Sequence, residues 1–391
     1  MDLKSEYQNR IKKLQNRLAQ DRTDGVLLVY PIDVYYYTAT RQTATLWVPT
    51  EGQPVLLVKK SYERAKQESC VEDIRPFPRS KDFASIVNGA RTIGLTFDVL
   101  PVQQFQYYGK LLPDVTFVDI STAYRELRSV KSAWELERMR HAGRQLSAVI
   151  ASIGEIIKPG MREVDLAAEI EMRLRRCGGE GYVRMRAFNQ ELFHGLVVCG
   201  SGAAQGGFFD GAVTGRGLSA AAAHGASTDV LAPDQPILVD YTGVFDGYIV
   251  DMTRMFVCGT LDVKLTDAFK VARNIQDKIA AQLKPGAVCS DLFEQSKAMA
   301  QEAGLGDFYM GIPGENAKFV GHGVGLELDE LPVLAQGFDQ PLVAGQVIAV
   351  EPKFVFPDLG PVGIENTYAV TASGGEKITP LDDDMVMIAS V

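Results

Sequence analysis

The segment Pro236–Gly259 constrains the fold most, because it places two acidic residues inside long apolar runs. Asp246-Gly247 near its middle is a strong signal for a two-residue type I′ turn between two antiparallel strands. With these two residues as the loop, Asp240 and Asp251 project from the same face of the hairpin as diagonal neighbours. A register slip of one residue would put them on opposite faces, so the prediction depends on this turn.

A single carboxylate in an apolar strand is costly to bury, and the ordinary solution is a satisfied polar position in the core or at a sheet edge. Two carboxylates on one face repel each other in addition. A bound cation removes that repulsion. The pair Asp240 and Asp251 therefore indicates a cation site.

A second acidic pair lies near the C-terminus. Glu351 follows the apolar run VIAV, Glu365 lies in GIENTYAV, and Pro357–Leu359 between them reads as a three-residue turn. That loop makes the two glutamates direct cross-strand partners, an arrangement that is destabilising for like charges. His322 lies between the two pairs, in the glycine-rich run GHGVG, where the backbone can approach closely.

Four carboxylates and one imidazole form an oxygen-rich donor set. Such a set suits two divalent ions, with Mn, Co, Fe or Zn favoured over a metal that prefers thiolates. Two ions about 3.5–4 Å apart can share a water molecule and lower its pKa, which supplies a nucleophile at neutral pH. The spacing of these residues suggests this chemistry without specifying it.

The chain divides before a long helical pattern that begins near Ser132, where Ser132 and Glu135 form a capping box. The preceding part alternates short apolar strands with helical segments, as in an α/β domain. We therefore predict an N-terminal domain of residues 1–127 and a second domain of residues 128–391.

The second domain contains a short sequence motif that occurs twice. Lys158-Pro159-Gly160 and Lys284-Pro285-Gly286 are each followed, after four intervening residues, by Asp-Leu, and each lies between two helical patterns. Two similar helix–turn–helix joints would explain this, since Pro and Gly end helices. The alternative is a pair of related halves, each with two helices followed by strands. One predicted strand region is Gly181–Phe188.

Composition excludes several classes of protein. The formal net charge of −9 argues against a general nucleic-acid or anionic-membrane binder. The five cysteines are scattered and form no CxxC pair, so neither a disulfide framework nor a zinc cluster is expected. The N-terminus carries no signal-peptide pattern and no apolar run is long enough to span a membrane. We expect a cytoplasmic protein.

Taken together, these motifs resemble the pita-bread metallopeptidases, the family of methionine aminopeptidase, proline-specific aminopeptidase, prolidase and creatinase. The resemblance implies that Asp240 binds one ion, that His322 and Glu351 bind the other, and that Asp251 and Glu365 bridge them. It also implies a homodimer, and a creatinase/prolidase-like domain at residues 1–127. The implied fold is an α/β N-terminal domain plus an α+β pita-bread C-terminal domain with pseudo-twofold halves.

The resemblance extends to catalysis. His224 precedes Asp240 by the distance at which the family carries an active-site histidine, which binds substrate or a tetrahedral intermediate; a loop histidine is the plainer interpretation. Glu351 is the expected proton shuttle. Two departures concern substrate: Asp329 stands where proline-specific members carry a second histidine, and Gly363 stands where many carry arginine.

Two arginines and a further histidine are candidates for contacts with substrate. Arg184 and Arg186 alternate in a predicted strand, so they would share a face and hold a substrate carboxylate or pair with acidic neighbours. His194 could supply an imidazole, although a structural role is more usual for such a residue.

The resemblance thus implies a dinuclear metal-dependent hydrolase of the Xaa-Pro dipeptidase or aminopeptidase type, acting on a short peptide or a small amide. Two alternatives remain open. One keeps the fold and metals but uses a non-peptide amide or amidine, or is a lyase. The other is a binding protein with a retired site.

Overall fold

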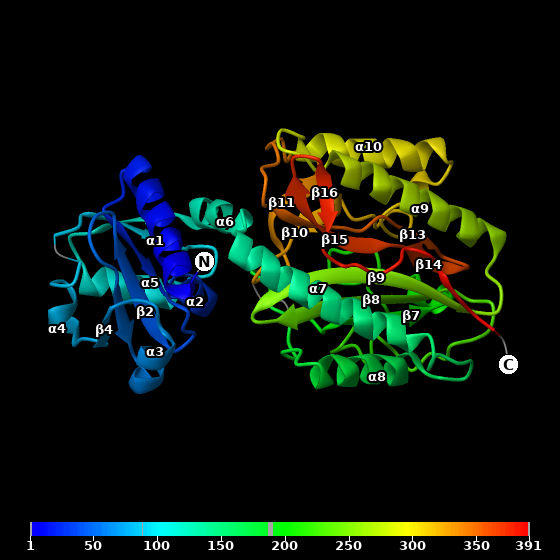
Figure 1. Ribbon diagram of the computed structural model, residues 1–391, viewed down its shortest axis with the longest axis horizontal. Helices are drawn as coiled ribbons and strands as arrows, with labels where there is room; N and C mark the ends of the chain where they lie inside the picture. The colour runs from blue at the N-terminus through cyan, green and yellow to red at the C-terminus, as the bar shows by residue number, and fades with distance from the viewer. Residues whose placement is uncertain (1, 88, 187–190, 390–391) are drawn as a thin grey trace. The chain divides into compact units, whose positions relative to one another are not determined.

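The computed structural model describes residues 2–87, 89–186 and 191–389. Within them the chain forms two compact units. One comprises the chain up to Arg128 together with Arg186, and the other comprises Ser129–Met185 and the chain from residue 191 onward. Each unit has its own sheet and is described separately (Figure 1).

The N-terminal unit is built on a six-stranded mixed sheet with the strand order β4-β3-β2-β1-β5-β6. Its strands are β1 (Gly25–Leu28), β2 (Ala44–Pro49), β3 (Val55–Val58), β4 (Asp73–Pro76), β5 (Thr92–Leu95) and β6 (Thr116–Asp119). Its helices are α1 (Leu3–Gln20), α2 (Pro31–Thr38), α3 (Tyr62–Glu68), α4 (Ser80–Phe83) and α5 (Val102–Leu111), and α6 (Ser121–Ser129) follows them. Leu14 and Leu18 of α1 are buried, each only 1% exposed.

The second unit is built on a nine-stranded sheet, most of which runs in the order β11-β10-β12-β15-β9-β8-β7. Strand β16 pairs with β15, and β17 pairs with β9. The strands are β7 (Gly195–Cys199), β8 (Ile237–Phe245), β9 (Tyr248–Cys258), β10 (Phe319–Gly323), β11 (Glu330–Ala335), β12 (Val347–Val350), β15 (Glu365–Thr371), β16 (Gly374–Lys377) and β17 (Val386–Ile388). A separate ribbon consists of β13 (Lys353–Phe356) and β14 (Gly360–Gly363).

Helices cover this sheet in two pairs. They are α7 (Ala133–Ile153), α8 (Glu163–Arg176), α9 (Val263–Gln282) and α10 (Cys289–Glu302), with short 3₁₀ turns at Ser201–Ala203 and Gly306–Phe308. Helix α7 contacts β8 and β9 and α8 contacts β7, whereas α9 contacts β14 and β16 and α10 contacts β11 (Figure 1). Helix α7 begins with the predicted capping box of Ser132 and Glu135.

The two helix joints share more than their sequence. Gly160 and Gly286 have φ values of +89° and +91°, a conformation that glycine adopts without strain. Each donates its backbone N–H to a leucine carbonyl 2.9 Å away, Leu231 in the first half and Leu342 in the second. The same joint is therefore built twice, which favours two related halves over a chance repeat.

The central hairpin has the predicted register. Asp246 and Gly247 have positive φ values of 50° and 82°, as both residues of a type I′ turn require, and Asp240 pairs with Thr253. Asp251 lies opposite Thr242, so the two aspartates are diagonal neighbours on one face.

The strand predicted at Gly181–Phe188 is wrong over residues 181–186, which form no strand; residues 187 and 188 lie outside the described residues. Arg184 and Arg186 therefore do not alternate in a strand. The segment begins at Gly181, which has a φ of +80° that extended pairing does not allow.

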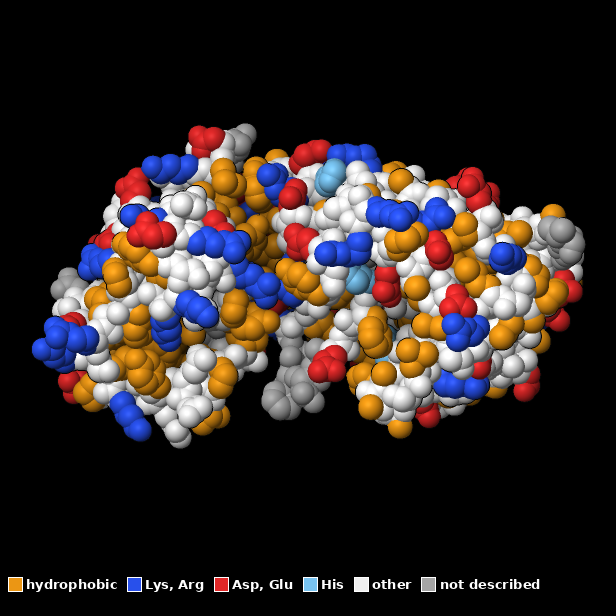
Figure 2. Space-filling model, turned by 90° about the horizontal axis from the view of Figure 1, so that it is seen from below, with side chains coloured by type: hydrophobic (Ala, Val, Ile, Leu, Met, Phe, Trp, Pro, Cys, Tyr) orange, Lys and Arg blue, Asp and Glu red, His pale blue; other side chains and the backbone are white. Residues whose placement is uncertain are grey.

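Acidic and basic side chains are interspersed over the face of the molecule in Figure 2. None of the helices in the described part of the chain combines the length and apolar character that crossing a membrane requires.

Candidate metal centre

Five adjacent strands bring the predicted ligand positions together. Asp240 and Asp251 come from the β8–β9 hairpin, and His322 lies on β10 beside Ala349 of β12. Glu351 follows β12 and Glu365 begins β15. The ladders on either side of them pair Val350 with Asn366 and Lys353 with Gly363, so the two glutamates lie opposite each other as the turn predicted.

The backbone fixes the tautomer of His322. Its Nδ1 lies 3.0 Å from the carbonyl oxygen of Leu328 and 3.2 Å from that of Gly323. A carbonyl only accepts, so Nδ1 carries the hydrogen and Nε2 is left to face the acidic cluster, 3.4 Å from Glu351 Oε1. This is the arrangement of a histidine that ligates a metal through Nε2.

Three buried side chains form the tightest group. Asp251, His322 and Glu365 each offer one ligand atom, and these atoms lie within 4.8 Å of one another. The Oε1 atom of Glu365 is buried and has no hydrogen-bond partner among the described residues. An unsatisfied carboxylate oxygen costs free energy inside a protein, so it indicates a ligand that completes the site.

A residue that sequence reasoning missed lies inside the cluster. The ammonium of Lys353 is 2.7 Å from Glu351 Oε2, 2.9 Å from Glu365 Oε2 and 3.0 Å from Asp240 Oδ2, and the side chain is only 3% exposed. A signal existed: Lys353 stands two residues after Glu351 in an extended run, which puts both on one face of a strand.

The pKa directions show how crowded the charges are. Burial, followed by the neighbouring Asp240, raises the pKa of Asp251 to about 7. Burial and the charge of Asp251 raise the pKa of Glu365 well above its usual range. Burial acts in the same direction on Glu351, but Lys353 and His322 together outweigh it and lower the pKa of Glu351 to about 2. The cluster needs positive charge to keep all its acids ionised.

Hydroxyl groups on the sheet contact Asp251 and Glu365. Thr253 Oγ1 donates to Glu365 Oε2 at 2.9 Å. Thr367 Oγ1 accepts from the backbone N–H of Asp251 and donates to its carbonyl, each at 2.9 Å. Behind them, the buried Arg254 donates to the Glu365 carbonyl at 2.9 Å. These contacts fix the strands that carry the acids.

His224 and His194 lie in the wall of the same cavity. His224 is packed among aromatic rings, with the centroid of Phe209 5.3 Å away and Phe193 stacked at 6.3 Å. Its buried Nδ1 has no hydrogen-bond partner among the described residues, and burial lowers its pKa. His224 is therefore neutral at pH 7 and able to donate or accept one hydrogen bond.

The cavity itself is small, about 80 Å³. At roughly 10–15 Å³ for each water position, it holds several water molecules or a small substrate group. It is lined by residues of three kinds: the acidic cluster with His322 and Lys353, the histidines His194 and His224, and a rim that includes Phe193, Phe209, Phe319, Leu328 and Asp329.

The residues predicted to bind substrate are divided by the structure. Asp329 lines the cavity and lies 3.4 Å from His322 Nδ1. Arg184 and Arg186 do not line it. Arg184 is buried and donates to the carbonyl oxygens of Leu326 and Gly247.

Arg186 belongs to the N-terminal unit, where its Nη1 lies 2.7 Å from Asp33 Oδ1 and its Nε lies 2.6 Å from Asp98 Oδ2. Backbone carbonyls and buried acids already occupy the donors of both side chains, so these contacts give no support to the prediction that Arg184 and Arg186 bind a substrate carboxylate. For Arg186 the plainer interpretation, pairing with acidic neighbours, is confirmed.

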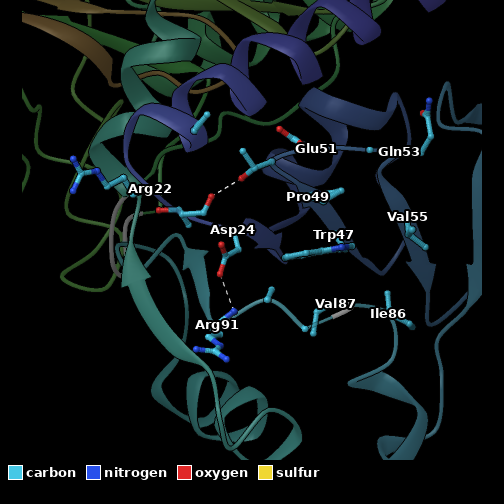
Figure 3. Close-up of a pocket in the computed structure, with 16 residues that line it drawn as sticks. Arg22, Asp24, Trp47, Pro49, Glu51, Gln53, Val55, Ile86, Val87 and Arg91 are labelled. Carbon is cyan, nitrogen blue, oxygen red and sulfur yellow. Dashed lines mark hydrogen bonds between the residues drawn. The ribbon is translucent and has the colours of Figure 1, made fainter.

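The N-terminal unit has a larger hollow of about 870 Å³. Figure 3 shows Asp24, Trp47 and Arg91 around it. The Asp24 carboxylate accepts from the backbone N–H groups of Arg91 at 2.8 Å and Thr92 at 2.9 Å, so it fastens β5. Among the described residues, the group with metal-ligand geometry lies in the other unit.

Comparison with known families gives two matches that together span most of the chain. The model of metallopeptidase family M24 matches residues 137–372, and the model of the creatinase/prolidase N-terminal domain matches residues 10–130. The first match alone covers more than half of the sequence and contains all five predicted ligand positions.

Similar proteins align with the chain over nearly its full length. The Xaa-Pro dipeptidase of Pyrococcus furiosus is 25% identical over 383 residues, which are 96% of this chain and 99% of that protein. The Xaa-Pro dipeptidase of Lactobacillus helveticus is 24% identical over 393 residues, 97% of this chain and 98% of that protein.

Solved structures resemble the chain to a similar extent. The prolidase of Pyrococcus horikoshii has a TM-score of 0.80 at 23% identity, covering 97% of this chain and all of that one. The Xaa-Pro dipeptidase from Bacillus anthracis has a TM-score of 0.82 at 22% identity, covering 97% and 99%. These likenesses confirm the predicted fold class.

Proposed function

Because the chain belongs to metallopeptidase family M24, we propose that it hydrolyses the amide bond of short peptides, with Xaa-Pro dipeptides as the substrate class. The observation that carries the proposal is the buried group of Asp251, His322 and Glu365 in the wall of a cavity. The names of the similar proteins from Pyrococcus furiosus and Lactobacillus helveticus support the choice of substrate.

The donor set fits a divalent cation. Carboxylate oxygens with one imidazole suit Mn, Co, Fe or Zn, and the unsatisfied Oε1 of Glu365 supplies an open acceptor. Asp251, His322, Glu351 and Glu365 would hold the cation. When bound, it supplies Lewis-acid chemistry, which activates water and polarises a carbonyl.

Two side chains of the cavity would act directly on the substrate or on the attacking water. The neutral His224 would donate a hydrogen bond to the carbonyl oxygen of the scissile bond, where negative charge develops. Glu351 would accept the proton of the attacking water. Its lowered pKa keeps it ionised at neutral pH and also makes it a weak base, so a group on the substrate side must assist the proton transfer.

The size of the cavity favours a short substrate. About 80 Å³ holds the reacting amide and one small neighbouring group. We assign the catalytic role to residues 128–391, with residues 1–127 as the accompanying N-terminal domain. A homodimer in the cytoplasm remains a prediction.

A second candidate keeps the fold and replaces the peptide by a small non-peptide amide. Two observations favour it: the Lys353 ammonium inside the acidic cluster, and the Asp329 carboxylate at the cavity rim. Both change the charge that a substrate meets.

A substrate panel tests the proposal. The purified chain with added Mn²⁺ or Co²⁺ is offered Xaa-Pro dipeptides, longer Xaa-Pro peptides, dipeptides without proline and small amides. We expect the highest kcat/KM for Xaa-Pro dipeptides. Turnover of small amides alone would favour the second candidate, and no turnover of any amide by metal-loaded protein would contradict both.

A further inference from the structure

Each of the two glutamates of the metal centre directs one carboxylate oxygen toward Lys353 and the other away from it. The Oε2 atoms of Glu351 and Glu365 both contact the Lys353 ammonium. The Oε1 atom of Glu351 instead faces His322 Nε2 at 3.4 Å, and the Oε1 atom of Glu365 has no hydrogen-bond partner among the described residues. The carboxylates thus straddle two cation positions, and one of these already contains a side chain.

The ammonium is fully satisfied where it lies. A lysine has three N–H donors, and Lys353 has three carboxylate acceptors within 3.0 Å, on Glu351, Glu365 and Asp240. A buried ammonium without its partners is strongly destabilising, so these three acids hold the charge where it lies.

The backbone also makes room for this lysine. Gly363 is the strand partner of Lys353, and a Cβ atom at position 363 would lie 2.5 Å from Lys353 Cγ and 2.8 Å from its Cα. Glycine at this position is therefore what allows the lysine stem to lie against β14. The lysine at position 353 and the glycine at position 363 therefore depend on each other for packing.

We propose that the Lys353 ammonium takes the place of one of two metal ions, so that the chain binds a single divalent ion on the Asp251–His322 side of the glutamates. A second ion would have to use the oxygens of Glu351, Glu365 and Asp240 that Lys353 occupies, and it would be repelled by the ammonium. Asp240 then serves as the counter-ion of a lysine and makes no contact with the metal.

The inference rests on the proposed function only in that a divalent ion binds, and it is independent of the substrate. It revises the expected pair of ions to one ion and one built-in cation. Metal stoichiometry therefore tests it directly, without any measurement of activity.

The experiment titrates metal-depleted full-length chain with Mn²⁺, following heat and bound metal, and records the electron paramagnetic resonance spectrum at saturation. We expect one ion per chain and the hyperfine spectrum of isolated Mn²⁺. Two ions per chain with a spin-coupled spectrum would overturn the inference and leave the proposed function standing. No bound ion would overturn both.

Two variants sharpen the result. Lys353→Ala frees three carboxylates, so we expect binding of a second ion and a spin-coupled spectrum. Asp240→Asn removes an acid that contacts the lysine, and we expect it to keep one ion with a change in dissociation constant below about tenfold, the lower end for loss of a residue that orients a ligand. A lost ion in Asp240→Asn would overturn the inference, even if Lys353→Ala does not fold.

Lys131→Met is the matched control. Lys131 is a second buried lysine of the same unit, 1% exposed and 3.1 Å from the carboxylate of Glu330. Removing it also takes one ammonium from a buried acid, but at a place outside the cluster. We expect the stoichiometry to stay at one ion, and a second ion in this variant would contradict the assignment to Lys353.

Discussion

Lys353 Nζ lies 2.9 Å from Glu365 Oε2, while the other oxygen of this carboxylate is buried and has no hydrogen-bond partner among the described residues. One glutamate thus meets a cation on one side and an unfilled acceptor position on the other. Asp251 and His322 lie on that second side. The metal chemistry of the chain is expected there.

Removing a ligand on that side should abolish tight metal binding. We expect Asp251→Asn and His322→Ala each to weaken binding of Mn²⁺ by more than the ~10–100-fold that loss of an outer-shell partner costs. Metal content after dialysis, measured by mass spectrometry, checks this. Asp267→Asn, an exposed acid on α9, is the control and should retain the ion. Full retention in both ligand variants would rule out this site.

His224 is expected to act on substrate and not on the ion. His224→Ala removes one hydrogen-bond donor near the developing charge, so kcat should fall by about 10²–10³ while metal content stays unchanged. Phe209→Leu, which changes a ring beside His224 and leaves its donor in place, is the comparison. If His224→Ala loses the metal, or loses no activity, the role assigned to it is wrong.

Asp329 can be tested with two substitutions. An ionised carboxylate at the cavity rim disfavours negative charge growing on a substrate oxygen, so we expect Asp329→His to increase Xaa-Pro cleavage. Asp329 also lies 3.4 Å from His322 Nδ1, where a carboxylate strengthens a histidine ligand. Measuring kcat and the metal dissociation constant for Asp329→His and Asp329→Asn separates these effects. Slower turnover with weaker metal binding in both would show that Asp329 supports His322.

The acid sensitivity of the N-terminal unit should depend on Asp98. Burial works to raise its pKa, but the hydrogen bond and charge of Arg186 hold it below the ordinary value of 3.8. The stabilisation is therefore complete above that value and is lost as the pH falls through the lowered pKa. We expect Asp98→Asn to lose on the order of 1 kcal/mol of unfolding free energy at pH 7.

Urea unfolding at pH 7 and near pH 3 measures this loss. A Trp134→Phe background leaves Trp47, which is buried in this unit, as the single tryptophan probe. The difference between wild type and Asp98→Asn should shrink at the lower pH. A difference that does not change with pH would contradict the role of the Asp98 charge.

Local rules were sufficient to predict the hairpin and the acidic face. Asp246-Gly247 selects one turn type, that turn fixes the register, and the register places Asp240 and Asp251 on one face. The three-residue turn placed Glu351 opposite Glu365 in the same way. In both cases the relevant contacts are close in sequence.

Long-range contacts were not predictable from such rules. The donors of Arg186 go to Asp33 and Asp98, far away in the sequence, and nothing near Arg186 indicates those partners. Lys353 was missed for a different reason: its position two residues after Glu351 was visible, but only the fold shows that it also contacts Glu365 and Asp240.

Release of proline from an Xaa-Pro dipeptide tests most directly whether the cluster serves a metal-dependent peptidase. Metal-depleted wild type is assayed before and after addition of Mn²⁺, beside Asp251→Asn under the same conditions. We expect release only after Mn²⁺ is added to wild type, and none from the variant. Equal release with and without the ion, or none from protein shown to hold its ion, would contradict this function.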